Sequence, residues 1–281
     1  MITDMSSHRR SSGMALIAVL WIVAALSLLV VGMAQTVRQQ IRVAGTQRDE
    51  VSGQALGEAA VALTLQALQV APERPRGLVQ VTQEFEGVGM EVEVMPLDGL
   101  IPLNGAGPAL LAAALKVAGG MNASAAEALA ATLVQWRDEP AEGGNRHLFE
   151  SVEDLLLVPG FDYSLYARLR PLFTTVARGG GVNPLAAPPE VLAVLADGDM
   201  GRAAEIAERR SNQGASADTS TLNQSFVSRG AADQYRISVK VPLEEGRILL
   251  LARDVGLTAA PSGEPWRVFS ATRRILPSSS P

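Results

Sequence analysis

The chain has 281 residues, a formal net charge of −5 and no cysteine. The lack of cysteine excludes a disulfide framework and cysteine catalysis. Lysine occurs only at Lys116 and Lys240, and no basic tract of the kind that binds nucleic acid is present.

The most apolar stretch runs from Met14 to Ala34 and contains 21 residues without a charge. As a helix it would extend ~31 Å, which matches the hydrocarbon core of a bilayer. The alternative is a buried helix of a soluble domain, but such helices usually keep a polar face. The sequence therefore predicts a transmembrane helix.

Two kinds of processing fit the short basic leader that ends at Gly13. A secretory signal peptide would be cut after the small residues that end at Ala34, although a run of 21 apolar residues is long for such a peptide. The other interpretation places the cut on the cytosolic side, between Gly13 and Met14, so that the apolar helix is kept. We favour the second, because the helical pattern does not stop at the membrane.

From Gln35 to about Leu68 the chain lacks proline and repeats apolar residues at steps of three and four, as an amphipathic helix does. Three glycines in this part weaken a helix by ~1 kcal/mol each, which predicts a kink or a loosened turn. Pro72 and Pro75 end the run. The weakening glycines are Gly45, Gly53 and Gly57.

Alternating apolar residues predict β-strands on both sides of a long helical stretch. Residues 78–95 read as a hairpin with its turn at 86–89, and the later strands are expected at 222–228, 233–243, 246–255 and 266–274. Between them, helices are expected at 108–118, 124–137, 151–158, 163–173, 188–196 and 199–210, with capping boxes formed by Ser124 with Glu127 and by Ser151 with Asp154.

A leader that ends in glycine, an apolar helix that becomes amphipathic and a β-rich soluble part together resemble the type IV pilin and pseudopilin family. The resemblance implies that a prepilin peptidase cleaves after Gly13 and methylates the new amino terminus at Met14. Most pilins have a glutamate at the fifth mature position, where this chain has Ala18. That glutamate is thought to neutralise the amino terminus of a neighbouring subunit within the membrane, so its absence suits a subunit at the fibre tip. Minor pseudopilin K of type II secretion lacks it in the same way.

Four further segments, taken in order, are similar to that pseudopilin family. They are Asp98 to Asn104, Trp136 to Asp138, Ser151 to Leu155 with Val158 to Gly160, and Val182 to Leu192. The resemblance implies an α+β fold with a long N-terminal transmembrane and amphipathic helix and a pilin-like antiparallel sheet that is interrupted by a large, all-helical inserted domain. The implied parts are a prepilin leader (1–13), the long helix (14–70), the first strands (78–104), the inserted domain (105–212), the remaining strands (220–276) and a disordered tail (277–281).

An acidic loop follows the Trp136 to Asp138 segment and offers oxygen ligands for a hard cation. Asp138, Glu139 and Glu142 are the candidate ligands, and relatives of pseudopilin K bind calcium in a similar region. A solvated acidic loop is the alternative. No other cofactor is expected.

Nothing in the sequence makes a catalytic site. His147 is the one histidine outside the leader, so neither a zinc site nor a pair of histidines can form in the mature chain. Gly179 to Gly181 lack the residues of a phosphate loop and read as a flexible connector. The turn from Val158 to Asp162 resembles a DNA-binding helix-hairpin-helix, but Asp162 stands where a second glycine is wanted, so helix packing is the better interpretation.

The expected function is therefore assembly: a minor pseudopilin at the tip of the type II secretion pseudopilus that supports its initiation and protein export. Its expected partners are other minor pseudopilins, the prepilin peptidase, the inner membrane and secreted substrates, with no nucleic acid. The expected location is the inner membrane, with one span, a cytoplasmic amino terminus and the bulk of the chain in the periplasm. The alternatives are a minor pilin of a type IV pilus or DNA-uptake system and, less favoured, a membrane-anchored periplasmic enzyme.

Overall fold

The computed structural model describes residues 11–140, 146–177, 179–228, 233–259, 263 and 265–277. It is an α+β structure in which an antiparallel sheet and a set of short helices follow one long helix. The chain divides between Ser52 and Gly53 into two compact units. The predicted combination of helices with an antiparallel sheet is confirmed.

The long helix, α1, spans Ser11–Val70 and contributes to both units. A search of the described residues finds no helix with the length and hydropathy required to cross a bilayer.

The helical assignment of α1 continues through Gly45, Gly53 and Gly57, and the expected kink or loosened turn stays a prediction. Two of these glycines lie where the helix approaches the sheet. A Cβ atom on Gly53 would lie 2.5 Å from Leu243 Cδ2, and one on Gly57 would overlap Leu251. They allow close packing at these positions.

Five antiparallel strands form the main sheet of the second unit in the order β1-β2-β5-β6-β7. The predicted hairpin is confirmed, with Glu86 and Gly87 at positive φ in its turn. The predicted strands at 233–243, 246–255 and 266–274 are confirmed as well. The bounds are β1 Val79–Phe85, β2 Val88–Pro96, β5 Gln234–Pro242, β6 Arg247–Gly256 and β7 Arg267–Pro277.

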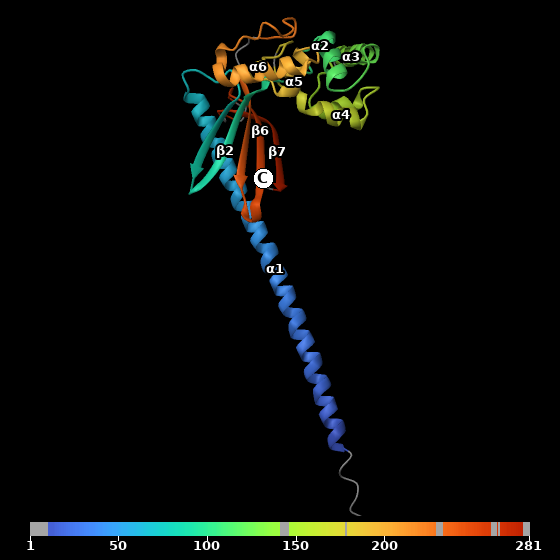
Figure 1. Cartoon of the computed structure of the whole chain (residues 1–281), viewed down its shortest axis with the longest axis vertical. Helices are drawn as coiled ribbons and strands as arrows, with labels where there is room; N and C mark the ends of the chain where they lie inside the picture. The colour runs from blue at the N-terminus through green and yellow to red at the C-terminus, as the bar shows by residue number, and fades with distance from the viewer. Residues whose placement is uncertain are drawn as a thin grey trace, which may run out of the picture. The chain divides into compact units, whose positions relative to one another are not determined.

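One face of this sheet packs against the C-terminal part of α1 (Figure 1). Because side chains alternate between the faces of a strand, every second residue of β2, β5 and β6 points into this core. The core combines Ala60, Val61, Leu65 and Leu68 of the helix with Met90, Val92, Val94, Tyr235, Ile237, Val239, Val241, Leu249, Leu251 and Val255 of the sheet.

The chain between β2 and β5 is mainly helical and has its own hydrophobic core. Figure 1 shows its helices gathered beyond one end of the five-stranded sheet. The α-helices are α2 Pro108–Val117, α3 Ala123–Asp138, α4 Tyr163–Leu169, α5 Pro189–Leu195 and α6 Met200–Gln213. The 3-10 helices of the chain are η1 Leu97–Gly99, η2 Val152–Leu157, η3 Arg170–Leu172, η4 Gly214–Ser216 and η5 Glu244–Gly246.

Some local predictions for the helical region are wrong. The segment expected as an α-helix at 151–158 is the 3-10 helix η2, although its capping box of Ser151 and Asp154 is present. α3 is capped by Asn122, whose Oδ1 accepts from Ala125 N at 2.9 Å, so the expected box of Ser124 and Glu127 does not start it. The predicted helix at 163–173 gives way at its end to η3 and to a strand.

The last corrections concern strands. β3 (Ile101–Pro102) and β4 (Phe173–Thr174) pair in parallel and were not predicted. Residues 222–228 form no strand: Val227 makes one bridge to Val182, and Leu222 and Phe226 are buried in the helical core. Pro277, expected in a disordered tail, ends β7.

Candidate functional site

The residues of the predicted processing site fall within α1. Gly13 and Met14 belong to this helix, but the Met14 side chain lies outside the described part of the structure. Ala18 is exposed in the isolated chain. Cleavage after Gly13, methylation of Met14 and the meaning of Ala18 stay predictions.

A buried amide joins the sheet to the helical region. The Asn183 side chain donates from Nδ2 to the backbone oxygen of Arg76 at 2.8 Å and lies 3.3 and 3.4 Å from the two carboxylate oxygens of Asp98. Its backbone N–H donates to Asp98 O at 2.7 Å, and its Oδ1 accepts from Leu185 N at 3.0 Å. Asn183 therefore ties together three segments: the link from α1 to β1, η1 after β2, and the loop before α5.

The loop that carries Asn183 is also held from the opposite side. Arg210 of α6 donates from Nη1 to the backbone oxygens of Pro184, at 3.2 Å, and of Ala187. Burial lowers the pKa of this guanidinium. On the sheet side, a Cβ on Gly99 would lie 2.5 Å from the backbone of Ala186, so only glycine fits there. The loop is thus held tightly at the junction.

Asp98 is the acidic group of this junction. Burial raises its pKa to about 6, against the opposing effect of the hydrogen bond from Asn183. Tyr235 lies near enough for the Asp98 charge to raise its pKa, although burial is the larger cause and brings that pKa to about 12. The Tyr235 hydroxyl donates to Pro75 O at 3.3 Å. Near neutral pH the junction therefore holds a partly buried carboxylate that lies within hydrogen-bond distance of the Asn183 amide.

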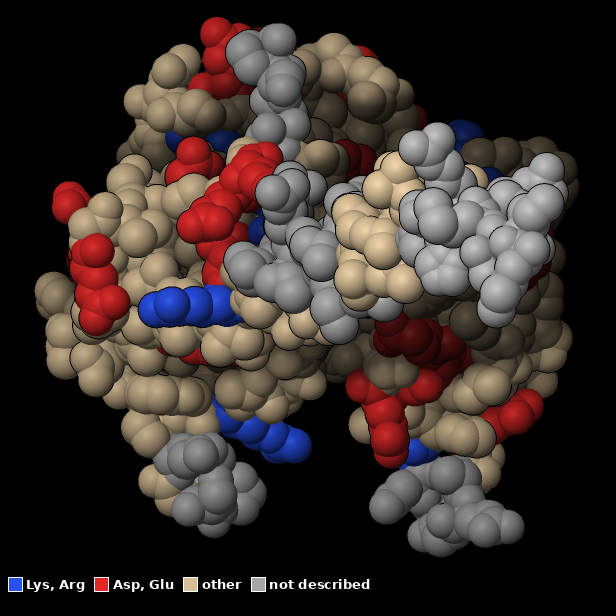
Figure 2. Space-filling view, turned by 90° about the horizontal axis from the view of Figure 1, so that it is seen from below, with Lys and Arg blue, Asp and Glu red and all other residues tan. Residues whose placement is uncertain are grey.

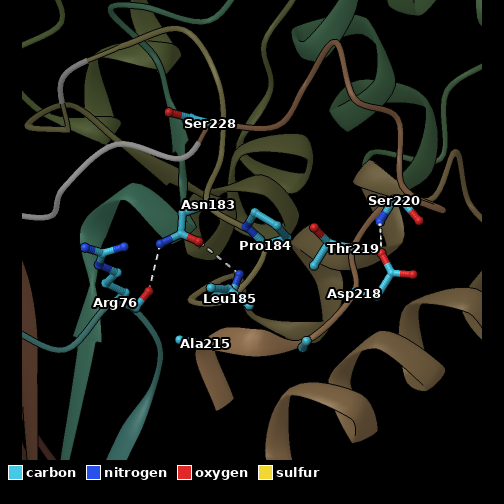
Figure 3. A pocket seen from close by; sticks show the side chains of 10 residues that line it. Arg76, Asn183, Pro184, Leu185, Ala215, Asp218, Thr219, Ser220 and Ser228 are labelled. Carbon is cyan, nitrogen blue, oxygen red and sulfur yellow. Dashed lines mark hydrogen bonds between the residues drawn. The ribbon is translucent and has the colours of Figure 1, made fainter. Parts of the chain in front are cut away.

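A pocket of about 300 Å³ opens beside this junction (Figure 3). Asp218 on its rim accepts a hydrogen bond from Ser220 N at 2.9 Å, and such hydrogen bonds lower the pKa of this carboxyl. The lining offers hydroxyls, an amide and a guanidinium, without a histidine to activate a hydroxyl. The lining residues are Arg76, Asn183, Pro184, Leu185, Ala215, Ala217, Asp218, Thr219, Ser220 and Ser228.

A second polar anchor, Asn104, follows β3 inside the helical region. Its Nδ2 donates to the backbone oxygens of Phe149 at 2.9 Å and Thr175 at 3.1 Å, and its Oδ1 accepts from Phe149 N at 2.8 Å. Next to it, the ring of Phe149 stacks on Trp136 with the centroids 4.6 Å apart, and His147 stacks on the same indole at 4.5 Å. The structure therefore places His147 in an aromatic stack.

The predicted calcium ligands are only partly described. Asp138 Oδ1 lies 3.3 Å from Arg137 Nε, and Glu139 Oε1 accepts from Gln135 Nε2 at 3.5 Å. Glu142 lies outside the described residues. Within the described ranges, no three histidine, cysteine or acidic side chains form a group that could hold a metal. Calcium binding stays a prediction.

Two other sequence motifs now have structural explanations. Asp162 caps α4, since its Oδ1 accepts from Leu165 N at 2.7 Å, which accounts for an aspartate at this turn. In the glycine run, a Cβ on Gly181 would lie 2.9 Å from Phe226 O. This glycine allows two backbone segments to approach, so the run is more than a connector.

Sequence reasoning noted the segments that contain Asp98 and Asn183 but did not predict that they meet. The two residues are 85 positions apart, and the pairing depends on how the helical region returns to the sheet. The available signal for Asp98 was an aspartate followed by glycine within an apolar stretch. Acidic residues are seldom buried unless they have a partner.

We predict that Asp98→Asn stabilises the chain at pH 7 by about 1–2 kcal/mol. One pKa unit corresponds to ~1.4 kcal/mol, and the partial exposure of the site screens part of the effect. The folded-state pKa lies above the ordinary value of 3.8, so the wild-type carboxyl stabilises the fold fully below about pH 4. That contribution is lost as the pH rises through about 6.

Thermal unfolding of the full chain in detergent at pH 4, 5, 6 and 7 measures this difference. The exposed Glu127 on α3 provides the control, and Glu127→Gln should leave the pH dependence unchanged. A wild-type chain that gains stability relative to Asp98→Asn between pH 5 and 7 would contradict the prediction.

Comparison with known proteins gives a similarity to solved structures. No protein-family model matches the sequence, and neither does any curated protein. Among solved structures, the chain is similar to one from the crystal structure of the GspK-GspI-GspJ complex of the enterotoxigenic Escherichia coli type 2 secretion system. The two are 15% identical, the match covers 84% of this chain and 98% of that chain, and the TM-score is 0.48. At these values the similarity does not assign a family or a function to this chain.

Proposed function

We propose that this chain is a minor pseudopilin of a type II secretion system that takes its place at the tip of the pseudopilus. In this role it supports initiation of the pseudopilus and the export of proteins across the outer membrane. The chain acts by assembly, and no catalytic step is assigned to it.

The observation that carries the proposal is the course of the N-terminal helix. The uncharged stretch from Met14 to Ala34 belongs to α1, the same helix whose later residues Ala60 to Leu68 form one side of the sheet core. A cleaved signal peptide has no need of such a continuation. A helix that is retained after cleavage at Gly13 would serve as the part by which the subunit is built into a filament.

The helical region supports the position at the tip. It enters the chain between β2 and β5, two strands that are neighbours in the sheet, so it is an insertion into an otherwise simple meander. A bulky insertion at one end of the sheet would block the addition of a further subunit above it. The absence of an acidic residue at Ala18 is in keeping with this position, since a tip subunit has no neighbour above it to neutralise.

The remaining parts of the proposal follow from this role. The chain would span the inner membrane once, with its amino terminus in the cytoplasm and its sheet and helical region in the periplasm. Its partners would be the prepilin peptidase, the other minor pseudopilins and secreted substrates. The insertion favours this role over a minor pilin of a type IV pilus or DNA-uptake system.

Gly13→Ala tests the proposal. The variant is expected to keep its leader and to lose nearly all secretion activity, because the added Cβ atom would stand directly before the bond that the peptidase is expected to cut. Mass spectrometry of the amino terminus should find N-methylated Met14 in the wild type and the intact leader in the variant.

Ser11→Ala, a similar change two residues upstream, serves as the control and should be processed normally. Normal processing of Gly13→Ala, or a mature wild-type chain that starts near Gln35, would overturn the proposed function.

A further inference from the structure

The final strand, β7, is an unusually open edge of the sheet. It pairs with β6 from Arg267 to Pro277, and within the described residues no strand pairs along its other side. Every residue of β7 except Phe269 is exposed, and the exposed residues include Val268, Ile275 and Leu276. With 11 residues it is about twice as long as a typical strand. Its free edge therefore offers a long row of backbone groups for pairing with another chain.

The charge of β7 is uniformly positive. It carries Arg267, Arg273 and Arg274 and no acidic residue. Arg274 lies opposite Leu250 of β6, and Arg267 lies opposite Gly256, which places both arginines on the face of the sheet away from α1. The Arg267 guanidinium lies over the ring of Phe269, 5.2 Å from its centroid. This side of the edge therefore displays two cations, one near each end of the strand.

The opposite edge of the sheet has the opposite charge. The chain as a whole is acidic, and the face of the molecule seen in Figure 2 shows more acidic than basic surface. At the other edge of the sheet, the hairpin of β1 and β2 carries Glu84, Glu91 and Glu93, of which Glu91 is paired with Lys240. The two strands beside β7 are basic as well, with Arg247 and Arg253 in β6 and Arg236 and Lys240 in β5, so the sheet is positive toward β7 and negative toward the hairpin.

The positive charge of β7 determines which kind of strand can pair with it. Two copies of β7 placed edge to edge would bring arginines close together, and like charges on adjacent strands destabilise a sheet. Charged residues on an edge are a common means of preventing self-association. An acidic strand would instead place carboxylates next to Arg267 and Arg274, so backbone pairing and charge would act together.

We infer that β7 is a docking strand that extends the sheet by pairing with an acidic edge strand of a neighbouring pilin-like subunit. The inference rests on the proposed function, which makes pilin-like heads the neighbours of this chain. The hairpin of β1 and β2, with Glu84 on the edge strand and Glu91 and Glu93 on the strand beside it, is an example of an acidic hairpin at a sheet edge. Exposed apolar side chains at both ends of β7 would be covered by the added strand.

The test uses the full chain, coexpressed in the membrane with the other pilin-like subunits of its secretion system and purified in detergent. Arg267→Glu combined with Arg274→Glu should reduce the amount of the neighbouring subunit that copurifies by roughly tenfold or more. Lys116→Glu combined with Arg202→Glu reverses two exposed or partly exposed charges on α2 and α6 and should leave it unchanged. Equal melting temperatures of the variants would show that both are folded.

A second measurement does not depend on charge reversal. Because the chain has no cysteine, Thr272→Cys in β7 introduces a single thiol. This thiol should form a disulfide with a cysteine placed in the acidic edge strand of the neighbour, whereas Thr132→Cys on α3 should not.

The outcomes separate the two proposals. Copurification that is equally strong with and without the arginines, together with the absence of the Thr272 cross-link, would overturn the docking strand and leave the proposed function intact. If no pilin-like subunit copurifies with the wild-type chain, both the docking strand and the proposed function are overturned. Self-association that depends on Arg267 and Arg274 would assign β7 to a second copy of this chain and overturn the inferred partner.

Discussion

Arg137→Met is expected to destabilise the fold by about 2–5 kcal/mol, because it leaves two buried carbonyl groups without a donor. Arg137 is the last buried residue of α3 and is only 8% exposed. Its Nη1 donates to Leu103 O at 3.0 Å and to Ala106 O at 2.9 Å. Methionine keeps most of the volume of the side chain, so the loss reports mainly on these hydrogen bonds.

The effect should be visible in denaturant unfolding of the full chain, followed by circular dichroism in detergent. Arg202→Met on α6 is the matched control. The Arg202 side chain is 41% exposed and pairs with Asp199 at 3.4 Å, so its loss should cost no more than about 1 kcal/mol. Two variants of equal stability would show that the Arg137 hydrogen bonds are not important for the fold.

Sequence patterns predicted the sheet well because its strands have one buried and one exposed face. Tyr235, Ile237, Val239 and Val241 alternate with polar residues, and all four are buried against α1. The same reasoning failed at Leu222 and Phe226, which are apolar because they enter the core of the helical region. A short apolar segment shows that a residue is buried but does not show which core receives it.

The candidate site could be predicted only in part. The segments around Asp98 and Asn183 stood out in the sequence, but their hydrogen bonds link residues that are 85 positions apart. No local periodicity reports on such a contact. The cap of α3 shows a similar limit on a smaller scale: Ser124 with Glu127 satisfies the pattern of a capping box, but Asn122 begins the helix earlier and takes that role.

Two glycines of α1 show the limit of an argument from helix propensity alone. Glycine lowers helix propensity by ~1 kcal/mol, and that rule alone predicts a weak point. Packing reverses the conclusion at Gly53 and Gly57, because the sheet comes so close to the helix there that a side chain would overlap it. Local propensity and tertiary packing thus make opposite predictions for the same substitution.

Gly57→Leu separates the two and is expected to destabilise the second unit by roughly 3 kcal/mol. A Cβ at this position would lie 3.2 Å from Val241 Cγ2 and would overlap Leu251, and both of these residues are fully buried. Because the neighbours are part of a packed core, they cannot move aside without opening space elsewhere. Propensity alone would predict a gain of ~1 kcal/mol from the same change.

Gly45→Leu is the matched control, since no atom lies within 4 Å of the position of its Cβ. This variant should be as stable as the wild type or slightly more stable. Thermal unfolding of both variants in detergent, followed by near-ultraviolet circular dichroism, measures the difference directly, because Trp266 packs against the same core. If Gly57→Leu melts at or above the wild-type temperature, the close packing of α1 against β5 and β6 is wrong, and helix propensity governs this part of the chain.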